Sequence, residues 1–346
     1  MAESGSVTVS SAIRLLIIGP SWVGDMVMAQ SLFITLKQQN PLYQLDVLAP
    51  SWSLALLERM PEVQQGIAMP LGHGQFDFSH RLHLGQKLRS AAYQQCIVLP
   101  NSWKSALIPF FAKIPRRTGF LGEARWGLLN DIRHLNKSRL SMTVQRFVAL
   151  GLDKSIFETP DYPSPRLSVS SSQQAEVIKK FAIDHTQNIV AFCPGAEYGP
   201  AKRWPAEHFA QLAILLHRQN RQIWLIGSEK DRQTCDIINQ QSGNICSNFA
   251  GLSSLGEAVD LLSLADVVVS NDSGLMHVAA ALDKKLIAIY GSSDPGFTPP
   301  LNPNAKIIRK TLDCAPCFKR LCPLGHTHCL TEIQPESLFS AINTLD

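Results

Sequence analysis

Asp266-Val-Val-Val-Ser270-Asn-Asp-Ser-Gly274-Leu-Met-His277-Val-Ala-Ala-Ala281 is the stretch that decides the fold. Its β-branched apolar run predicts a buried strand, and the small and apolar residues after Gly274 predict a helix. Asn271–Gly274 forms a tight polar turn between them. Open α/β sheets bind ligands outside the carboxyl ends of their strands, and free N–H groups at a helix start favour an anion. We therefore predict that this turn binds a phosphate-bearing ligand.

A second strand, turn and helix open the chain. Leu15–Ile18 predicts a strand, Gly19-Pro-Ser-Trp-Val-Gly24-Asp25 forms the turn, and an apolar helical pattern follows. No Lys-Ser or Lys-Thr follows the second glycine, and G-x-G-x-x-G is absent, so the turn is neither a P-loop nor a dinucleotide fingerprint. Two ligand-facing turns so far apart predict two sheets that face one central cleft.

The composition is that of a globular protein with about two domains. The chain has 346 residues, of which 45% are hydrophobic and 17% charged. Its net charge of +4 is too mild to imply nucleic acid, and it is compatible with an anionic ligand. Met1–Ser11 lacks the pattern of a signal peptide, and no apolar stretch reaches membrane-spanning length. We therefore expect a cytoplasmic protein.

Strands alternate with helices along the chain, which predicts an α/β fold with parallel sheets. Three prolines in Thr159-Pro-Asp-Tyr-Pro-Ser-Pro165 interrupt this alternation and predict a linker. We expect strands at 13–19, 45–49, 96–100, 189–193, 222–227, 267–270, 286–290 and 306–309. The predicted division is a disordered extension (1–11), a first Rossmann-like domain (12–158), a linker (159–172) and a second Rossmann-like domain (173–346). The last helix belongs to the second domain or, alternatively, packs back on the first.

The loop Pro194–Pro205 carries two adjacent cations, Lys202 and Arg203, after a predicted strand. Its glycines permit close approach, and its cations can bind a pyrophosphate. Alone, such a pair is more typical of solvated surface. In one domain with the Asn271–Gly274 turn, phosphate binding becomes the better interpretation.

Further polar residues near these turns are candidates for nucleotide binding. Glu229 and Asp231 follow a predicted strand, where an acid often accepts hydrogen bonds from ribose hydroxyls, although a helix cap is nearly as common. Asp272 or Ser273 either caps the following helix or binds ligand. His277, one turn into that helix, either faces the ligand or is a buried histidine.

Asp25 stands at the start of a predicted helix and is either a first-turn acid or a catalytic base. A helix N-terminus lowers a carboxyl pKa below about 3.9. A general base works best when its pKa is near the working pH. A catalytic Asp25 would therefore require desolvation in a closed cleft, or proton uptake late in the reaction.

Cys314-x2-Cys317-x4-Cys322-x6-Cys329 places four cysteines within sixteen positions. Tetrahedral zinc is chemically plausible, but the spacing matches no standard zinc finger. A compact loop of reduced thiols and a redox-sensitive disulfide are the alternatives. In the first half, basic residues form a looser group that is individually typical of solvated surface: Lys104, Arg116, Arg117, Arg125 and Arg133.

Four blocks together resemble the lipopolysaccharide heptosyltransferases. They are Gly19-Pro-Ser-Trp-Val-Gly-Asp25, Pro100-Asn-Ser-Trp-Lys-Ser-Ala106, Pro194-Gly-Ala-Glu-Tyr-Gly-Pro-Ala-Lys-Arg-Trp-Pro205 and Asn271-Asp-Ser-Gly-Leu-Met-His277. The resemblance runs from about Leu15 to the last helix, and the first and third blocks favour the type II branch over types I and III. It implies a GT-B architecture, with an acceptor-binding first domain and an ADP-heptose-binding second domain. It also implies inverting transfer of L-glycero-D-manno-heptose from ADP-L-glycero-β-D-manno-heptose to heptosyl-Kdo2-lipid A, in the lipopolysaccharide inner core.

The resemblance also implies roles for individual residues. Asp25 matches the acid that is the family's proposed base, Lys202 the lysine linked to donor phosphates, and Asp272 the aspartate linked to the donor heptose. Ser273 and Gly274 then offer backbone N–H groups to the pyrophosphate. The predicted donor set is Lys202, Arg203, Glu229, Asp231, Asp272, Ser273, Gly274 and His277, and the predicted acceptor set is Gly24, Lys104, Arg116, Arg117 and Arg125.

The family needs no nucleotide-bound metal, and the sequence has no evident DxD triplet after a strand, so no cofactor beyond the donor is expected. The implied acceptor is a lipid, which implies peripheral contact with the inner face of the inner membrane and no nucleic-acid partner. Two other functions stay open for this chain. One is a GT-B sugar-nucleotide epimerase, and the other is a non-catalytic nucleotide-sugar-binding protein.

Overall fold

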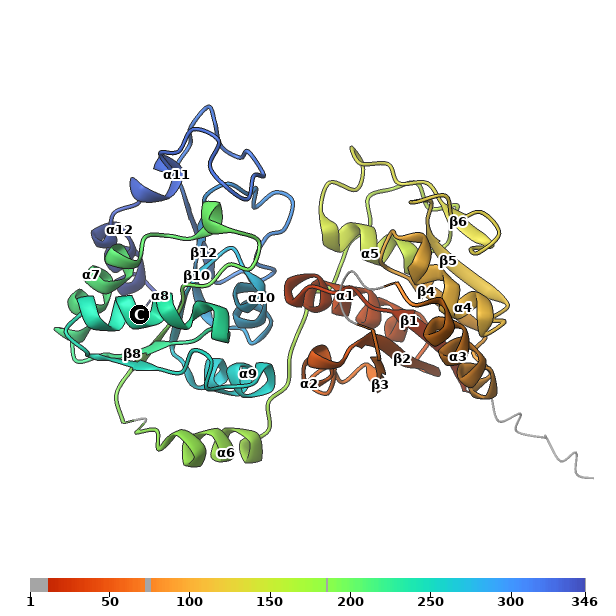
Figure 1. The fold of residues 1–346 in the computed structure, drawn as a ribbon, viewed down its shortest axis with the longest axis horizontal. Helices are drawn as coiled ribbons and strands as arrows, with labels where there is room; N and C mark the ends of the chain where they lie inside the picture. Colours follow the sequence, from red (N-terminus) through yellow and green to blue (C-terminus); the bar gives the residue numbers. More distant parts are fainter. Residues whose placement is uncertain (1–11, 72–75, 185, 346) are drawn as a thin grey trace, which may run out of the picture.

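The structure is a computed structural model that describes residues 12–71, 76–184 and 186–345. Two six-stranded sheets lie side by side along the long axis, each flanked by helices (Figure 1). The extension predicted over 1–11 lies outside the described residues. Among those residues, no helix is long and apolar enough to cross a membrane.

The first sheet is entirely parallel, in the spatial order β3-β2-β1-β4-β5-β6. Its strands are β1 (Ile13–Ile18), β2 (Tyr43–Pro50), β3 (Val63–Met69), β4 (Gln95–Val98), β5 (Arg116–Phe120) and β6 (Asp131–Arg133). The helices of this half are α1 (Val23–Gln39), α2 (Leu54–Leu57), α3 (Phe78–Leu88), α4 (Leu107–Phe111) and α5 (Thr143–Gly151).

The second sheet repeats this arrangement, in the order β9-β8-β7-β10-β11-β12. Its strands are β7 (Ile189–Cys193), β8 (Gln222–Leu225), β9 (Cys246–Asn248), β10 (Val267–Asn271), β11 (Lys285–Tyr290) and β12 (Ala305–Arg309). Its helices are α6 (Ser171–Phe181), α7 (Ala206–His217), α8 (Arg232–Gln241), α9 (Leu255–Leu264), α10 (Gly274–Ala281), α11 (His328–Thr331) and α12 (Pro335–Asn343).

Within each half, the strand order is therefore 3-2-1-4-5-6. The order reverses between β1 and β4 in the first sheet and between β7 and β10 in the second. In doubly wound sheets, ligands bind outside the carboxyl ends of the strands at this switch point. The fold thus predicts two ligand-binding edges, one in each half.

The sequence predicted the central strands but missed β3, β5, β6 and β9. The missed strands are outer ones: β3, β6 and β9 are edges, and β5 lies next to an edge. Central strands such as β7 and β10 are buried throughout; β7 is apolar along its whole length, and β10 begins with three valines. The outer strands are partly exposed and contain polar or charged residues, so they lack that signal.

The alternative placement of the last helix on the first domain is wrong. Helix α12 packs on α7 and β11 of the second half. Leu338 and Ile342, four residues apart on one face of the helix, are fully buried in the core that covers the second sheet. Burial of this apolar stripe explains why α12 stays with its own sheet.

The two halves share one hydrophobic core. Leu15 and Ile17 of β1, Phe33 of α1, and Val268 of β10 belong to the same buried cluster. Helix α1 packs directly on α10, which joins the inner faces of the two sheets (Figure 1). The main chain at Arg166, between the halves, bonds to both ends of the Gln30 side-chain amide, at 2.6 and 2.9 Å.

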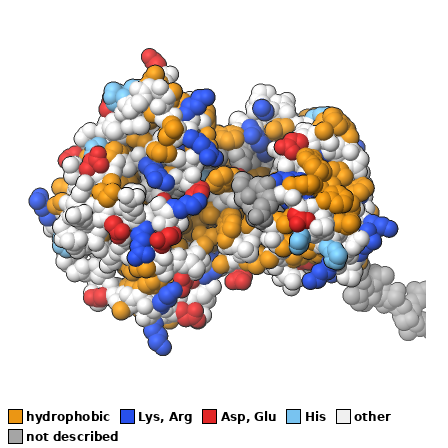
Figure 2. All heavy atoms as spheres, in the orientation of Figure 1, with side chains coloured by type: hydrophobic (Ala, Val, Ile, Leu, Met, Phe, Trp, Pro, Cys, Tyr) orange, Lys and Arg blue, Asp and Glu red, His pale blue; other side chains and the backbone are white. Residues whose placement is uncertain are grey.

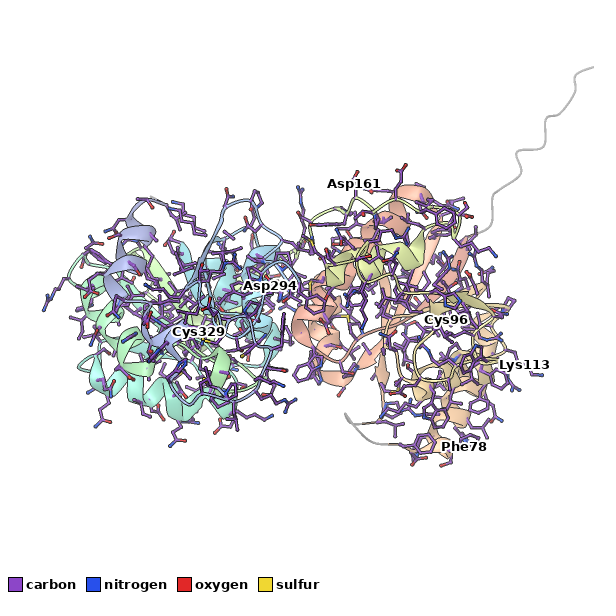
Figure 3. The ribbon with its side chains drawn as sticks, turned by 90° about the horizontal axis from the view of Figure 1, so that it is seen from above. Phe78, Cys96, Lys113, Asp161, Asp294 and Cys329 are labelled. Atoms are coloured by element: carbon purple, nitrogen blue, oxygen red, sulfur yellow. The ribbon has the colours of Figure 1, made fainter. Side chains whose placement is uncertain are left out.

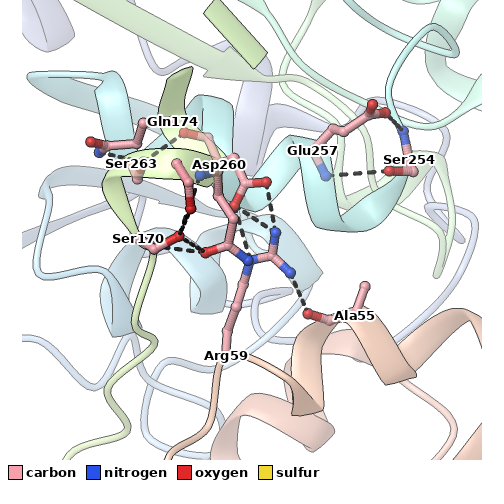
Figure 4. Close-up of polar contacts among 10 residues, drawn as sticks. Ala55, Arg59, Ser170, Gln174, Ser254, Glu257, Asp260 and Ser263 are labelled. Atoms are coloured by element: carbon pink, nitrogen blue, oxygen red, sulfur yellow. Dashed lines mark hydrogen bonds and ion pairs between the residues drawn. The ribbon is translucent and has the colours of Figure 1, made fainter. Parts of the chain in front are cut away.

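A buried ion pair also joins the halves. The Arg59 guanidinium, just after α2, lies 2.6 Å from both carboxylate oxygens of Asp260 on α9 (Figure 4). The two residues are only 5% and 4% exposed. Burial raises the pKa of Asp260 even beside this cation. The carboxylate therefore depends on Arg59 to remain charged.

Replacing Arg59 with Met should lower the free energy of unfolding by about 3–5 kcal/mol, because it leaves a buried carboxylate without its partner. Urea denaturation would measure this loss. A matched control is Lys180→Met, since the Lys180–Glu257 pair also reaches α9 at 2.6 Å but is exposed. That change should cost less than about 1 kcal/mol. Equal losses in the two variants would contradict the prediction, and Arg59→Met with Asp260→Leu should recover most of the stability.

Candidate active site

Helices α1 and α10 begin at the two switch points, and their amino ends meet. A side-chain carbon added at Gly24 would lie 2.6 Å from Cδ2 of His277, and one added at Gly274 would lie 2.6 Å from Cβ of Val23. Real side-chain carbons do not approach neighbours this closely. The two glycines therefore allow an approach that any larger residue would prevent. It brings the residues after β1 next to those after β7 and β10.

Asp25 lies in the first turn of α1, partly buried, at the wall of a cleft. Burial raises the pKa of its carboxyl to about 6, against an opposing effect of the nearby Lys202 ammonium. Desolvation therefore raises the pKa of Asp25 by more than the helix N-terminus is expected to lower it. A general base at the start of a helix requires this balance. A carboxylate with this pKa can accept a proton near neutral pH.

Lys202 and Asp272 come together from separate loops. Lys202 follows β7, Asp272 follows β10, and the ammonium lies 2.5 Å from Oδ2 of the carboxylate. The hydroxyl of Ser293 donates to the same oxygen, and Asp272 is only 4% exposed. The Lys202 ammonium also lies over the ring of Tyr198, 5.2 Å from its centre. The structure thus joins Asp25, Lys202 and Asp272 in one region.

A cleft of about 540 Å³ opens beside Asp25. Nearly all of its wall comes from the first half, including Lys104, while Phe297 and Thr298 come from the second. Two further cations line it: Arg81 of α3 and Arg146 of α5. The Arg146 guanidinium lies 4.8 Å from the centre of the Phe297 ring, across the boundary between the halves. Neither arginine was predicted, because the residues next to an isolated arginine in a helix do not show that its side chain faces a cleft.

The other predicted acceptor residues lie elsewhere. Arg116 and Arg117 are at the amino end of β5, whereas the cleft is lined by Phe120 at its carboxyl end. Arg116 pairs with Asp131 at 2.9 Å, and Arg117 donates to two backbone carbonyls at 2.6 and 2.7 Å. Their positions do not support acceptor binding, because the residues at the two ends of a strand face opposite edges of the sheet.

Arg125 and Gly24 also differ from the prediction. Arg125 is completely buried, and its guanidinium donates to the carbonyls of Pro100, at 2.7 Å, and Phe120. Both of these residues line the cleft, so Arg125 holds the wall in place rather than contacting an acceptor. Burial lowers the pKa of Arg125 to about 10. Gly24 faces His277 instead of the cleft.

The remaining donor candidates surround the amino end of α10. Ser273 precedes the helix and Gly274 begins it. His277 is buried, which lowers its pKa to about 4, so it is a neutral residue packed between the halves. Arg203 donates to the carbonyl of Ala196 at 3.3 and 3.4 Å.

Glu229 and Asp231 have structural partners in the loop after β8. Asp231 accepts hydrogen bonds from the backbone and hydroxyl of Ser228, at 2.9 and 2.7 Å, which is the helix-cap alternative. Glu229 is exposed and lies 3.5 Å from Arg232. Asp231 lies near the loop after β7, since a side-chain carbon added at Gly195 would lie 2.4 Å from its carboxyl carbon, whereas Glu229 lies against Gly251 after β9.

Comparison with known proteins agrees with this geometry. Residues 81–328 match the model of glycosyltransferase family 9 (heptosyltransferase). The chain belongs to this family. Lipopolysaccharide heptosyltransferase 2 of Escherichia coli is 45% identical over 96% of this chain and 98% of its own length. Lipooligosaccharide heptosyltransferase 2 of Haemophilus influenzae is 51% identical over 86% of this chain and 88% of its own length.

A solved structure of E. coli ADP-heptose LPS heptosyltransferase II superposes with a TM-score of 0.86, at 43% identity over 96% of this chain and 98% of that one. The predicted GT-B fold, the heptosyltransferase family and the preference for its type II branch are therefore confirmed. The chain is a glycosyltransferase, and the alternative of a non-catalytic binding protein is not supported.

The four clustered cysteines of this heptosyltransferase lie together and are not joined by a disulfide. Cys314, Cys317, Cys322 and Cys329 line one small cavity of about 20 Å³, and all four are free. No group of three or more His, Cys, Asp or Glu in the described part of the chain is arranged to hold a metal ion, so this geometry does not support the zinc alternative.

The cysteine-rich loop also forms hydrogen bonds with the loop after β7. The carbonyl of Arg320 accepts from the backbone N–H of Ala201 at 3.1 Å, and that of Phe318 accepts from the Tyr198 hydroxyl at 2.7 Å. Both donors belong to the loop that carries Lys202. The cysteine-rich loop is thus packed behind the predicted phosphate-binding loop.

Gly24→Ala should lower kcat/KM by tenfold or more, because the new methyl group would collide with the His277 ring and separate α1 from α10. Steady-state kinetics of the purified heptosyltransferase would measure the loss. His277→Ala in the same chain removes the collision and should restore part of the activity lost in Gly24→Ala. Unchanged kinetics in Gly24→Ala would show that this close approach is not needed for activity.

Proposed function

We propose that this glycosyltransferase moves L-glycero-D-manno-heptose from ADP-heptose to heptosyl-Kdo2-lipid A, with inversion at the anomeric carbon. The names of its relatives supply the donor and the lipopolysaccharide acceptor. One observation carries the mechanism: a carboxylate with a pKa of about 6 lies at the cleft of one half, within electrostatic reach of a lysine from the other. Such a pair can activate an acceptor hydroxyl on one side and stabilise a leaving phosphate on the other.

The reaction is proposed to be a single displacement. An acceptor heptose hydroxyl attacks the anomeric carbon of the donor heptose while its proton passes to the Asp25 carboxylate. The bond between the anomeric carbon and the β-phosphate oxygen breaks, and ADP leaves with both bonding electrons. The partial burial of Asp25 keeps its pKa close to the working pH, as general base catalysis requires.

Charge grows on the β-phosphate as that bond breaks. We place Lys202, Arg203 and the backbone N–H groups of Ser273 and Gly274 against it, because all four belong to the loops at the second switch point. Asp272 holds the Lys202 ammonium in position and is itself placed to meet the donor heptose. These groups need no metal ion to offset the phosphate charge.

The acceptor is proposed to occupy the cleft beside Asp25. Arg81, Lys104 and Arg146 line this cleft and can meet the phosphates or Kdo carboxylates of the inner core. Since lipid A is anchored in a bilayer, the enzyme is expected to work in peripheral contact with the inner face of the inner membrane.

Purified enzyme should release ADP from ADP-heptose only when heptosyl-Kdo2-lipid A is present. A coupled assay of ADP would measure this dependence, with Kdo2-lipid A as the matched control acceptor. Release with the unheptosylated control alone would reassign the enzyme to the type I reaction. Conversion of ADP-heptose to another nucleotide sugar, with neither acceptor present, would favour the epimerase alternative.

Asp25→Asn should lower kcat by about 10²–10⁴, and wild-type kcat/KM should fall tenfold per pH unit below about pH 6, where Asp25 becomes protonated. The same change should stabilise the protein. Because the folded-state pKa is raised, ionising Asp25 costs stability as pH rises from about 4 to 6, so the free energy of unfolding of the Asn variant should exceed that of the wild type by about 3 kcal/mol at pH 7.5.

This gain in stability should vanish near pH 4, where Asp25 is protonated in both states. Urea denaturation at the two pH values would measure the difference. Lys202→Met offers a contrast, since it should weaken ADP binding far more than Asp25→Asn does. A pH–rate profile in Asp25→Asn identical to that of the wild type would rule out Asp25 as the base.

A further inference from the structure

Five aromatic side chains, four of them exposed, form two contact groups on the first half. Phe76, Phe78, Trp103 and Phe110 are 53%, 49%, 41% and 41% exposed. Phe111, the last residue of α4, is partly buried. The rings touch in two groups: Phe76 with Trp103 at 5.2 Å between centres, and Phe111 with both Phe78 and Phe110 at 5.4 and 5.6 Å. We call these five residues the aromatic surface.

The figures show where this surface lies. Helices α3 and α4, which carry Phe78, Phe110 and Phe111, pack against each other. Hydrophobic side chains gather over this part of the first half in the space-filling view (Figure 2). Seen from above, Phe78 lies at one edge of the molecule and Asp161 at the opposite edge (Figure 3). Phe78, one member of the aromatic surface, therefore lies at an edge of the molecule (Figure 3).

The chain around the aromatic surface is strongly basic. From Phe78 to Arg117 the sequence has seven Lys and Arg and no Asp or Glu, whereas the whole chain has a net charge of only +4. The cations are Arg81, Lys87, Arg89, Lys104, Lys113, Arg116 and Arg117. Two of them touch the aromatic surface: the Arg117 guanidinium lies 5.6 Å from the centre of the Phe110 ring, and Arg89 donates to the Phe111 carbonyl at 2.9 Å.

The acids nearest to the aromatic surface are engaged in local contacts. Asp77 accepts hydrogen bonds from the backbone and ring of His80, at 3.0 and 2.7 Å, and from Ser79. These bonds hold the pKa of Asp77 well below its usual range. Glu123 accepts from the backbone N–H of Trp103 at 3.2 Å. Both acids stay charged, but from Asp77 to Glu123 the seven Lys and Arg outnumber these two acids, so the region keeps an excess of positive charge.

Exposed aromatics among lysines and arginines fit the interfacial zone of an anionic bilayer. Trp and Phe side chains enter the boundary between headgroups and acyl chains, while Lys and Arg attract anionic headgroups. The surface is also placed for a lipid acceptor. Trp103 is flanked by Ser102 and Lys104, and both of these residues line the cleft beside Asp25.

We propose that the aromatic surface, together with Lys87, Arg89 and Lys113, seats this protein on an anionic phospholipid bilayer with the acceptor cleft beside the lipid. The benefit of this placement rests on the proposed function, which supplies the lipid-anchored acceptor. Binding to the bilayer itself does not require turnover. The two proposals can therefore fail separately.

Flotation of the full chain with vesicles tests the proposal. The vesicles contain phosphatidylethanolamine with about one-quarter phosphatidylglycerol, and vesicles of phosphatidylcholine alone serve as the uncharged control. The parent chain should float with the anionic vesicles, and Phe78→Ser with Phe110→Ser should reduce the partition coefficient about tenfold or more. Phe157→Ser is the matched control, since Phe157 is 80% exposed and has no ring contact with the residues of the aromatic surface.

A second pair of variants tests charge without changing the aromatic surface. Lys87→Glu with Lys113→Glu should also reduce binding to anionic vesicles at least tenfold. Lys154→Glu with Lys179→Glu, which changes two exposed lysines elsewhere, should reduce it by less than threefold. All variants should release ADP normally with a delipidated, soluble acceptor saccharide. Loss of that activity in every chain, the parent included, would count against the proposed function and leave vesicle binding measurable.

Three results would overturn the proposal. The parent chain could fail to float with anionic vesicles, or the Phe78 and Phe110 variant could float as well as the Phe157 control. The aromatic surface could instead join two copies of the chain. In that case the parent would elute as a dimer, the Phe78 and Phe110 variant as a monomer, and neither would bind vesicles.

Discussion

The close approach of α1 and α10 is the constraint on which the rest of the structure depends. Each helix starts at a switch point, and each has a glycine where the other helix would strike a side chain. Because these glycines let the helix starts meet, Asp25 from one half lies within electrostatic reach of Lys202 from the other. The same contact desolvates the Asp25 region, and desolvation sets the pKa that a base requires. The contact between α1 and α10 thus both packs the two halves together and contributes to the raised pKa of Asp25.

Much of the fold follows from local sequence, because the strands next to the switch points carry buried apolar runs, such as residues 189–193 and 267–269. The polar turns after those strands also stand out, and the structure brings Asp25, Lys202 and Asp272 together as their positions in the sequence predict. Their roles in catalysis remain predictions. The outer strands β3, β5, β6 and β9 escaped prediction because polar or charged residues interrupt them and no long apolar run marks them, whereas the edge strand β12 was predicted.

Arginines were the main failure of prediction from sequence. In the sequence, Arg116 and Arg117 cannot be distinguished from Arg81 and Arg146. In the structure, only Arg81 and Arg146 line the cleft. Whether an arginine on a given strand or helix faces the cleft depends on the order of the strands in the sheet. That order is set by contacts between residues far apart in the sequence. Arg125 shows a further difficulty, since its guanidinium is wholly buried and bonds to carbonyls of two neighbouring loops. No local pattern distinguishes it from a solvated arginine.

The repeated strand order has a consequence for how such enzymes can diversify. Each half has its own switch point, so under the proposed division of roles the acceptor side can change without altering the donor side. Chimeras that exchange whole halves between relatives are therefore structurally reasonable. Their weak point is the seam, because Gly24 and His277 come from different halves but fit only each other. A chimera should therefore keep a glycine at position 24 and a residue at position 277 that leaves room for the same close approach.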